Sequence, residues 1–344
     1  MRKFYHRWQK LGFFMAFVFS LLMQGMNVTA QTTAGNAVYN FLQLPYSAKA
    51  TALGGVNIST KNDLGLAMFN PALLENTMDG DVHVSIKPYY ASIKQYDFSG
   101  AHYWKKKNIL LGWGVHYMDY GSIQVRDVVG NDLGLIKPND YAVQVSMATN
   151  YIQNFQIGAS LKLIQSNYGA YKSNGLAFDI GLVYSAPSEL SNASILVKNI
   201  GVQTKSYLQK EELPFNIIIG WTKKLENAPV QFSITAERMS VWNNLYYDST
   251  FSNQEGMKRP SSTKNIFNHL VIGGAFFIGE QVELNLGYNF IRRFELNVDN
   301  QQNFMNGFSA GFGLALNRTK LQYGNAFFQK NLYHHITLFY ALKK

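Results

Sequence analysis

Apolar and polar residues alternate along many short segments of the chain. From Tyr141 to Tyr151 the odd positions are Tyr, Val, Val, Met, Thr and Tyr, and the even positions are Ala, Gln, Ser, Ala and Asn. The same period of two recurs in residues 176–184 and 284–290. Because successive side chains of a strand point to opposite faces, this pattern predicts β-strands with one apolar and one polar face.

The polar face of these segments favours a membrane barrel over a soluble β-sandwich. It consists of Gly, Ser, Asn, Gln and Thr with few Lys or Glu, whereas a soluble sheet would turn charged residues to solvent. The segments run about ten to twelve residues, the length that a tilted strand needs to cross hydrocarbon. Tyr141 and Tyr151 bracket one of them, as in an interfacial aromatic girdle. Since lipid offers no hydrogen bonds, we expect the strands to close on themselves.

The alternation predicts fourteen strands. They are expected near residues 82–92, 95–105, 108–118, 140–151, 154–165, 174–186, 192–200, 213–224, 229–240, 267–278, 281–291, 304–316, 318–328 and 332–342. Every second connection between predicted strands is short. The connections between these short ones include four long segments, residues 119–139, 201–212, 241–266 and 292–303. Short periplasmic turns and longer extracellular loops follow this rhythm. The predicted fold class is therefore an all-β, 14-stranded antiparallel transmembrane barrel over residues 81–344.

Residues 1–30 have the pattern of a cleaved signal peptide. An apolar core from Leu11 to Met23 precedes the small residues Val28-Thr29-Ala30, and the basic n-region contains Arg2, Lys3, Arg7 and Lys10. An uncleaved anchor is the alternative, but the apolar run is shorter than the roughly 20 residues of a spanning helix. Removing this segment lowers the formal net charge from +10 to +6.

Residues 31–80 depart from the strand pattern. They contain a Gly pair, two Pro and a helix-like segment from Asp63 to Leu74. A fourteen-stranded barrel is too wide for its own side chains to fill. We therefore expect this segment to form an N-terminal plug with helical turns inside the lumen, with a periplasmic appendage as the alternative.

Composition excludes several classes of protein. Charged residues make up 15% and aromatic residues another 15%, which does not fit a disordered chain or a coiled coil. Cysteine is absent, so disulfides, cysteine nucleophiles and iron–sulfur ligation are excluded. The remaining positive charge is scattered, and no basic run with interleaved aromatic residues predicts nucleic-acid binding.

No motif predicts catalysis, a metal or a cofactor. Ser, His and Asp occur, but nothing in their spacing places a nucleophile beside a base, and the seven His form no HExxH motif. His334 and His335 are adjacent in a strand and must face opposite sides. Asp179, on the polar face of a strand, is expected to hydrogen-bond in the lumen rather than to act as a base. We therefore expect a protein that is not an enzyme.

Two runs in residues 31–80 carry a family resemblance. YNFLQLPYSAKATALGGVNIS, followed by LAMFNPALL, resembles the N-terminal signature of the PorV/PorQ group of the Bacteroidetes type IX secretion system, within the FadL-like outer-membrane barrels. The resemblance covers nearly all of the chain after residue 30, including GSIQVRDVVGNDLG and the region from Ser166 to Tyr184. The motif Leu53-Gly54-Gly55 with Asn70-Pro71-Ala72 is shared with FadL-like barrels, and it does not separate PorQ-like from PorV-like members.

The resemblance implies a function as well as a fold. It implies a fourteen-stranded barrel in a Gram-negative, Bacteroidetes-like outer membrane that docks or anchors a surface protein of the attachment complex, similar to PorZ, which processes and attaches secreted cargo. Outer-membrane lipid is the other expected partner. The alternative on the same fold is a FadL-like channel or transporter for hydrophobic small molecules, because fold alone does not decide function.

The candidate functional residues fall in two places. The plug motif contains Leu53, Gly54, Gly55, Asn70 and Pro71; the Gly pair suits left-handed backbone or close approach in a crowded lumen, but an ordinary turn explains it equally well.

The second place is the long loop from 241 to 267, where aromatic and basic residues favoured at interfaces are Trp242, Tyr246, Tyr247, Phe251, Lys258 and Arg259. A solvated loop without a partner is the alternative. Deleting residues 246–262 is expected to release the surface partner and leave the barrel assembled.

Overall fold

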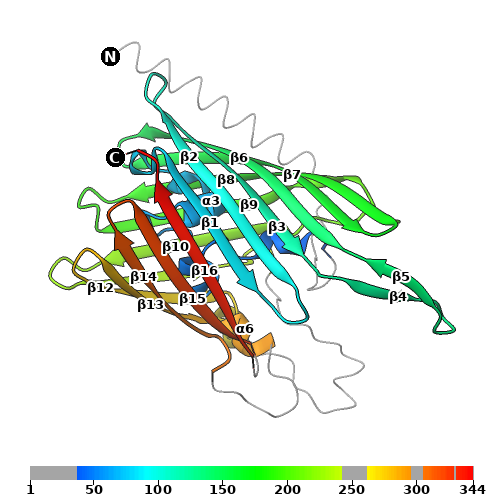
Figure 1. Cartoon of the computed structure of the whole chain (residues 1–344). Helices are drawn as coiled ribbons and strands as arrows, with labels where there is room; N and C mark the ends of the chain where they lie inside the picture. The colour runs from blue at the N-terminus through cyan, green and yellow to red at the C-terminus, as the bar shows by residue number, and fades with distance from the viewer. Residues whose placement is uncertain (1–36, 242–261, 296–304, 329–330, 344) are drawn as a thin grey trace. The chain divides into compact units, whose positions relative to one another are not determined.

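The computed structural model describes residues 37–241, 262–295, 305–328 and 331–343 (Figure 1). These residues belong to one compact unit. The expected signal peptide, residues 1–30, lies outside the described residues. The boundaries expected at residues 30 and 80 therefore stay predictions.

Fourteen strands form a closed antiparallel barrel. The order around the wall follows the chain, with β16 returning to pair with β1. The strands are β1 (Asp81–Pro88), β2 (Lys94–Trp104), β3 (Ile109–Asp119), β6 (Asn139–Ile152), β7 (Phe155–Tyr168), β8 (Tyr171–Ser185), β9 (Ser191–Lys205), β10 (Asn216–Lys224), β11 (Val230–Ala236), β12 (Leu270–Ile278), β13 (Val282–Asn289), β14 (Phe308–Leu316), β15 (Thr319–Phe328) and β16 (Asn331–Ala341). The prediction of a fourteen-stranded antiparallel barrel is confirmed.

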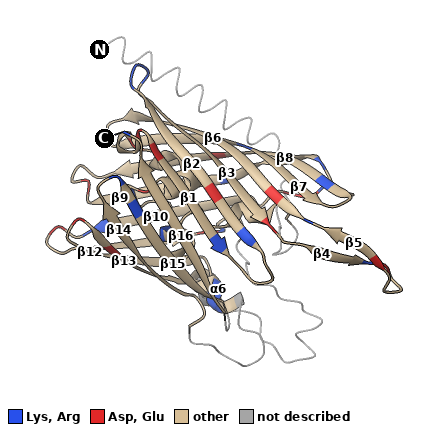
Figure 2. Cartoon of the chain, in the orientation of Figure 1, with Lys and Arg blue, Asp and Glu red and all other residues tan. Residues whose placement is uncertain are grey.

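The two faces of the wall differ as the alternation predicted. On β6, Val145 and Met147 point outward and are 57% and 53% exposed, whereas Gln144 and Ser146 point inward and are buried. Figure 2 shows that most of each strand carries neither acidic nor basic residues. The outer face is therefore an apolar surface suited to hydrocarbon, and the inner face is polar.

Residues 37–78 lie inside the barrel as a series of short helical turns. They are η1 (Asn40–Gln43), α2 (Ala48–Ala52), α3 (Leu64–Phe69), η2 (Pro71–Leu73) and η3 (Asn76–Met78). Three side chains cap them by accepting backbone N–H groups: Ser47 from Ala50, Asp63 from Leu66, and Asn70 from Ala72. Such caps satisfy donors that a short helix otherwise leaves unpaired. We call this segment the plug.

Within the described residues, two further helices lie outside the plug. They are α5 (Ser262–Phe267) and α6 (Phe290–Glu295). No helix in the described part of the chain is long and apolar enough to cross a membrane.

The two ends of the barrel carry different connections. At one end the strands are joined by tight turns, for example at residues 105–108, 153–154 and 279–281, and this end also holds the start of β1 and the end of β16. At the other end lie the longer connections, including residues 206–215. Following the usual arrangement of such barrels, we call these the periplasmic end and the outer end.

A two-stranded hairpin extends from the outer end, where the sequence predicted only a long loop over 119–139. Its strands are β4 (Ile123–Arg126) and β5 (Asp132–Ile136), which pair with each other and not with the barrel (Figure 1). Asp127 stabilises the turn by accepting the backbone N–H groups of Val129 and Asn131. These strands are too short for the alternation pattern to reveal them.

Candidate functional site

The plug packs against glycines of the barrel wall. A Cβ added at Gly181 would lie 2.2 Å from Asn70 Oδ1, and one at Gly158 would lie 2.4 Å from the Pro71 carbonyl carbon. Asn70 also donates to the Ile58 carbonyl at 2.8 Å and to Ser194 Oγ at 2.9 Å. The plug backbone therefore approaches the wall at distances that only glycine permits.

The Gly pair of the plug motif lies on the opposite side of the lumen. Gly54 and Gly55 both have φ of +98°, in the left-handed region. The Gly54 carbonyl accepts hydrogen bonds from Asn289 Nδ2 at 3.0 Å and Arg292 Nη2 at 3.1 Å. Leu53 is buried beside them. The residues of the plug motif thus hold the plug against the barrel wall, and they do so at two separate parts of the wall.

Charged side chains between plug and wall are buried. Lys162 Nζ lies 2.5 Å from Asp179 Oδ2, with both side chains fully buried, and it donates to Asn199 Oδ1 at 3.0 Å. Lys198 points at the plug, with its Nζ 3.1 Å from the centroid of the Phe69 ring. These contacts place charged groups inside the lumen, next to the plug. Asp179 also accepts the backbone N–H of Asn199, which is the hydrogen-bonding role expected from the sequence.

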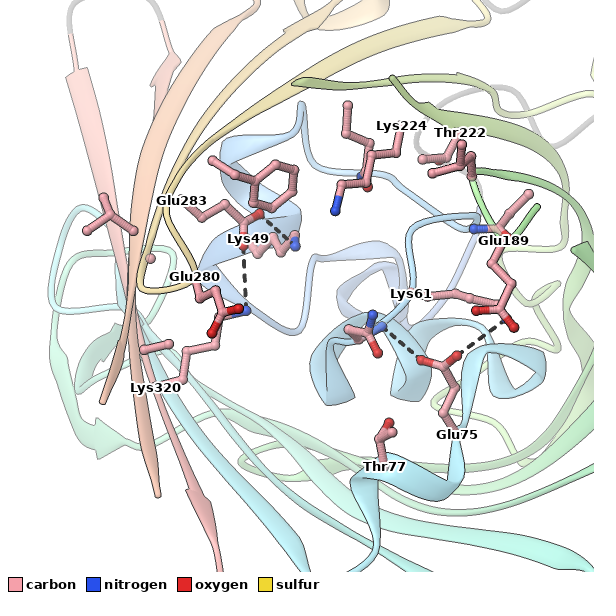
Figure 3. A pocket seen from close by; sticks show the side chains of 18 of the residues that line it. Lys49, Lys61, Glu75, Thr77, Glu189, Thr222, Lys224, Glu280, Glu283 and Lys320 are labelled. Carbon is pink, nitrogen blue, oxygen red and sulfur yellow. Dashed lines mark hydrogen bonds and ion pairs between the residues drawn. The ribbon is translucent and has the colours of Figure 1, made fainter. Parts of the chain in front are cut away.

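A charged cavity of about 690 Å³ opens at the periplasmic end, between plug and wall (Figure 3). Lys49 of the plug pairs with Glu283 of β13 at 2.6 Å, and Glu283 also lies 3.6 Å from Lys320 of β15. Lys61 pairs with Glu75 at 3.3 Å within the plug. We call this cavity the periplasmic vestibule. Its lysines and glutamates suit a water-filled opening rather than an apolar ligand.

The outer end carries a second cavity of different chemistry, of about 480 Å³. We call it the outer-mouth pocket. The start of the plug forms part of its wall, and the rest comes from the outer ends of the strands and from the connection after β9. Its lining residues are Ala37, Val38, Tyr39, Asn40, Phe41, Tyr120, Asp140, Ser166, Tyr168, Tyr171, Tyr207 and Leu208.

Five of the residues that line the outer-mouth pocket are tyrosines: Tyr39, Tyr120, Tyr168, Tyr171 and Tyr207. The rings of Tyr120 and Tyr168 lie 5.6 Å apart and are tilted by 37°, and the rings of Tyr168 and Tyr207 lie 5.9 Å apart, edge to face. Both geometries lie in the favourable range for aromatic pairs. The rings thus support one another around the cavity.

The tyrosine hydroxyls converge on Asp140, whose carboxylate is buried. Tyr120 donates to Asp140 Oδ2 at 2.7 Å and Tyr168 donates to the same oxygen at 3.3 Å. Ser166 donates to the other oxygen and in turn accepts from Tyr207. The pocket is therefore aromatic on its sides with one carboxylate among hydroxyl donors.

The protonation of two of these tyrosines follows from their surroundings. Burial raises the pKa of Tyr207 above its ordinary value; the hydrogen bond to Ser166 opposes this shift, and the negative charge of Asp140 adds to it. Burial and the charge of Asp140 raise the pKa of Tyr120 as well. Both phenols stay protonated at neutral pH, so both remain hydrogen-bond donors.

The other residues singled out in the sequence either lie outside the described residues or lie apart from the outer-mouth pocket. The loop residues Trp242, Tyr246, Tyr247, Phe251, Lys258 and Arg259 lie outside the described residues. His335 is buried and contacts Thr51, whereas His334 is on the outer face beside Tyr323. Among the described residues, no group of three or more His, Asp or Glu could hold a metal ion.

The outer-mouth pocket was not identified from the sequence. Its tyrosines are separated by up to 168 positions, between Tyr39 and Tyr207, and they are hidden among 21 Tyr. Asp140 offered one signal, because an acidic residue at the start of an alternating strand is unusual where the other polar positions are Gln and Ser. Strand register alone would then have placed it opposite Ser166.

Comparisons with known proteins support the architecture. No family model and no curated protein matches the sequence. Among solved structures, the chain is similar to the CymD monoaromatic hydrocarbon channel, with TM-score 0.53 and 13% identity over 89% of this chain and 99% of that one. It is also similar to the Pseudomonas putida toluene transporter TodX, with TM-score 0.52 and 11% identity over 86% and 97%. The fold is FadL-like. At these identities the likeness extends to the fold alone.

Proposed function

We propose that the protein is an outer-membrane channel that takes up small hydrophobic molecules at its outer mouth. The observation that carries the proposal is the outer-mouth pocket, an aromatic cavity of about 480 Å³ between the loops and the plug. Ligand pockets are commonly about 300–1,000 Å³, mostly apolar, with a few placed polar groups. The outer-mouth pocket falls in this range of volume, and it combines aromatic rings with a few polar groups. The apolar outer face of the barrel suits insertion in a membrane.

The remainder of the lumen supports a gated channel rather than an open pore. The plug lies between the outer-mouth pocket and the periplasmic vestibule, and it contacts the wall at Gly181 and Gly158 without space for a further side-chain atom. We infer that a solute in the pocket reaches the periplasmic vestibule when part of the plug shifts. The similar structures are channels for a monoaromatic hydrocarbon and for toluene, which makes toluene the first solute to test.

Uptake by intact cells tests this proposal. Gram-negative cells that express the protein should take up radiolabelled toluene faster than cells with an empty vector. Tyr168→Ala and Tyr207→Ala should lower the rate severalfold, because each removes a ring that lines the pocket. Val128→Ser, on the exposed tip of the hairpin, is the control and should leave uptake unchanged. Equal uptake with and without the protein contradicts the channel.

A docking role in type IX secretion is the second candidate. It is supported by the sequence resemblance to the PorV/PorQ group and by the hairpin at the outer end. Val129 at its tip is 81% exposed, and Leu133 and Leu135 on β5 are 63% and 66% exposed. Exposed apolar residues on a projecting hairpin suit contact with a surface protein such as the PorZ-like component of an attachment complex.

Co-purification separates the two candidates. If the protein docks such a partner, the partner should remain with the barrel in detergent extracts of the outer membrane. Deleting residues 124–135 or residues 246–262 should then release it, while the barrel still assembles. A partner retained after both deletions removes these segments from consideration. Toluene uptake without any bound surface protein supports the channel instead.

A further inference from the structure

We propose that the outer-mouth pocket selects small alkylated ammonium cations over neutral molecules of the same shape. The proposal rests on the proposed function only in taking this pocket as the site where solutes first bind. Asp140 and the tyrosine rings would bind such a cation whether or not bound solutes later cross the membrane.

Among the described residues, the carboxylate of Asp140 forms no salt bridge. Its side chain is 3% exposed, and the groups that contact its oxygens are the hydroxyls of Tyr120, Tyr168 and Ser166. No Lys or Arg in the described part of the chain forms an ion pair with it. His116 acts on Asp140 only through space, because its ring hydrogen-bonds to Asp97 and stacks on Phe41. A buried charge is costly unless it is compensated, so a cationic ligand would supply what the protein does not.

The hydrogen-bonding state of Asp140 narrows the kind of cation. A carboxylate offers about four lone-pair sites, and three hydroxyls already occupy most of them. A ligand with several N–H donors would find few free acceptor sites on this carboxylate. An alkylated ammonium needs only the electrostatic attraction, because its charge is spread over methyl groups that form no hydrogen bonds.

The tyrosine rings provide the second attraction. Tyr120, Tyr168 and Tyr207 present faces in different directions, since adjacent rings are tilted by 37° and 77°. The negative face of an aromatic ring attracts a cation within about 6 Å, and rings arranged around a quaternary ammonium are the usual way in which proteins bind it. The rings face the lumen side of the wall, so the ligand is a free solute rather than a lipid headgroup in the surrounding membrane.

Equilibrium binding to the whole protein in a maltoside detergent tests the proposal. The probes are choline and 3,3-dimethylbutan-1-ol, which have the same shape but differ in charge. Choline should bind about tenfold more tightly than the alcohol, since the charge adds cation–π and carboxylate attraction. Asp140→Asn should weaken choline binding about tenfold and leave the alcohol unchanged. Tyr207→Leu should weaken choline binding severalfold, whereas Val128→Ser, on the exposed tip of the hairpin, should bind choline as the wild type does.

Several outcomes would overturn the proposal. Equal affinity of the wild type for choline and the alcohol would do so, as would no saturable binding of choline, or choline binding unchanged in Asp140→Asn. If Asp140→Asn fails to assemble, the comparison of the two probes on the wild type still decides. Toluene uptake with no preference for choline contradicts this inference alone. A preference for choline with no uptake of any solute contradicts the channel alone.

Discussion

At the scale of single residues, glycine positions decide how the plug fits the wall. The inner face of the barrel has glycines where plug atoms approach closest, as at Gly181 opposite Asn70 and Gly287 opposite Gly54. These contacts join distant parts of the chain, so their partners could not be recognised from the sequence. The sequence did show the Gly pair and Asn70-Pro71, but not which strands they contact.

Enlarging a wall glycine tests this fit. Gly181→Ala should destabilise the folded protein by about 1–3 kcal/mol, because the new Cβ would overlap Asn70 Oδ1. The measurement is the temperature at which the folded barrel loses its altered mobility in gel electrophoresis. Gly274→Ala is the matched control, since its Cβ would have nothing nearer than 4.0 Å. A loss of stability that is equal in both variants would contradict the tight contact.

The ion pair of Lys162 and Asp179 allows a second test at this scale. Lys162→Met should lower the free energy of unfolding by about 3–5 kcal/mol, because it leaves a buried carboxylate without its partner. Adding Asp179→Leu should recover part of that loss, though the backbone N–H of Asn199 then loses its acceptor. Urea unfolding followed by Trp fluorescence provides the three values. Strictly additive losses would show that the pair is not coupled.

At the scale of elements, irregularities in the strands direct side chains into the lumen. Along β9 the register shifts opposite Asp179, so that Lys198 and Asn199 are consecutive and both buried. An extra residue of this kind breaks the alternation of faces, which is how a β-bulge re-aims a side chain. The period of two predicted the strand itself but could not predict this shift. Lys198 already points into the lumen by the regular alternation, and the bulge is the reason that Asn199 is buried beside it.

The hairpin of β4 and β5 is an independent element. Its strands pair only with each other, and the apolar side chains at its tip contact solvent. Replacing residues 124–135 with a short Gly-Ser link should therefore change the unfolding temperature of the barrel by little, within the scatter of surface substitutions. The same electrophoretic assay checks this. A large loss of stability would mean that the hairpin supports the barrel rather than extending from it.

At the scale of the whole molecule, the first and last strands close the barrel. Asp79, just before β1, accepts the backbone N–H of Tyr103 and pairs with Lys343 after β16 at 3.1 Å. These contacts, the first one foremost, lower the pKa of Asp79 to about 2 from its ordinary value of 3.8. Because the folded pKa is depressed, this carboxylate stabilises the fold above about pH 4 and loses that contribution as the pH falls toward 2.

Acid unfolding tests the role of this closing contact. The wild type should lose more stability between pH 5 and pH 2.5 than Asp79→Asn does, because only the wild type has this carboxylate to protonate. Asp132→Asn, on the exposed hairpin, serves as the control and should follow the wild type. The measured quantity is the unfolding midpoint at each pH. Identical pH dependence in the wild type and Asp79→Asn would contradict a contribution from the contact.

Most of the architecture was predictable from the sequence, because a barrel in lipid imposes one simple pattern on every strand. Segments such as 140–151 and 154–165 match β6 and β7 to within a few residues. The outer-mouth pocket was not predictable, since it depends on residues that meet only after the barrel has closed and the plug has entered it. The function expected for the long loop from 241 to 267 stays a prediction, because residues 242–261 lie outside the described residues.

The central claim is that an apolar solute binds between the plug and the loops at the outer mouth. Crystals of the protein soaked with iodobenzene test it directly, because anomalous scattering locates iodine without assumptions about the ligand. We predict an iodine peak inside the pocket bounded by Tyr120, Tyr168 and Tyr207. Peaks confined to the outer, lipid-facing wall, with the pocket free of iodine, would contradict the account.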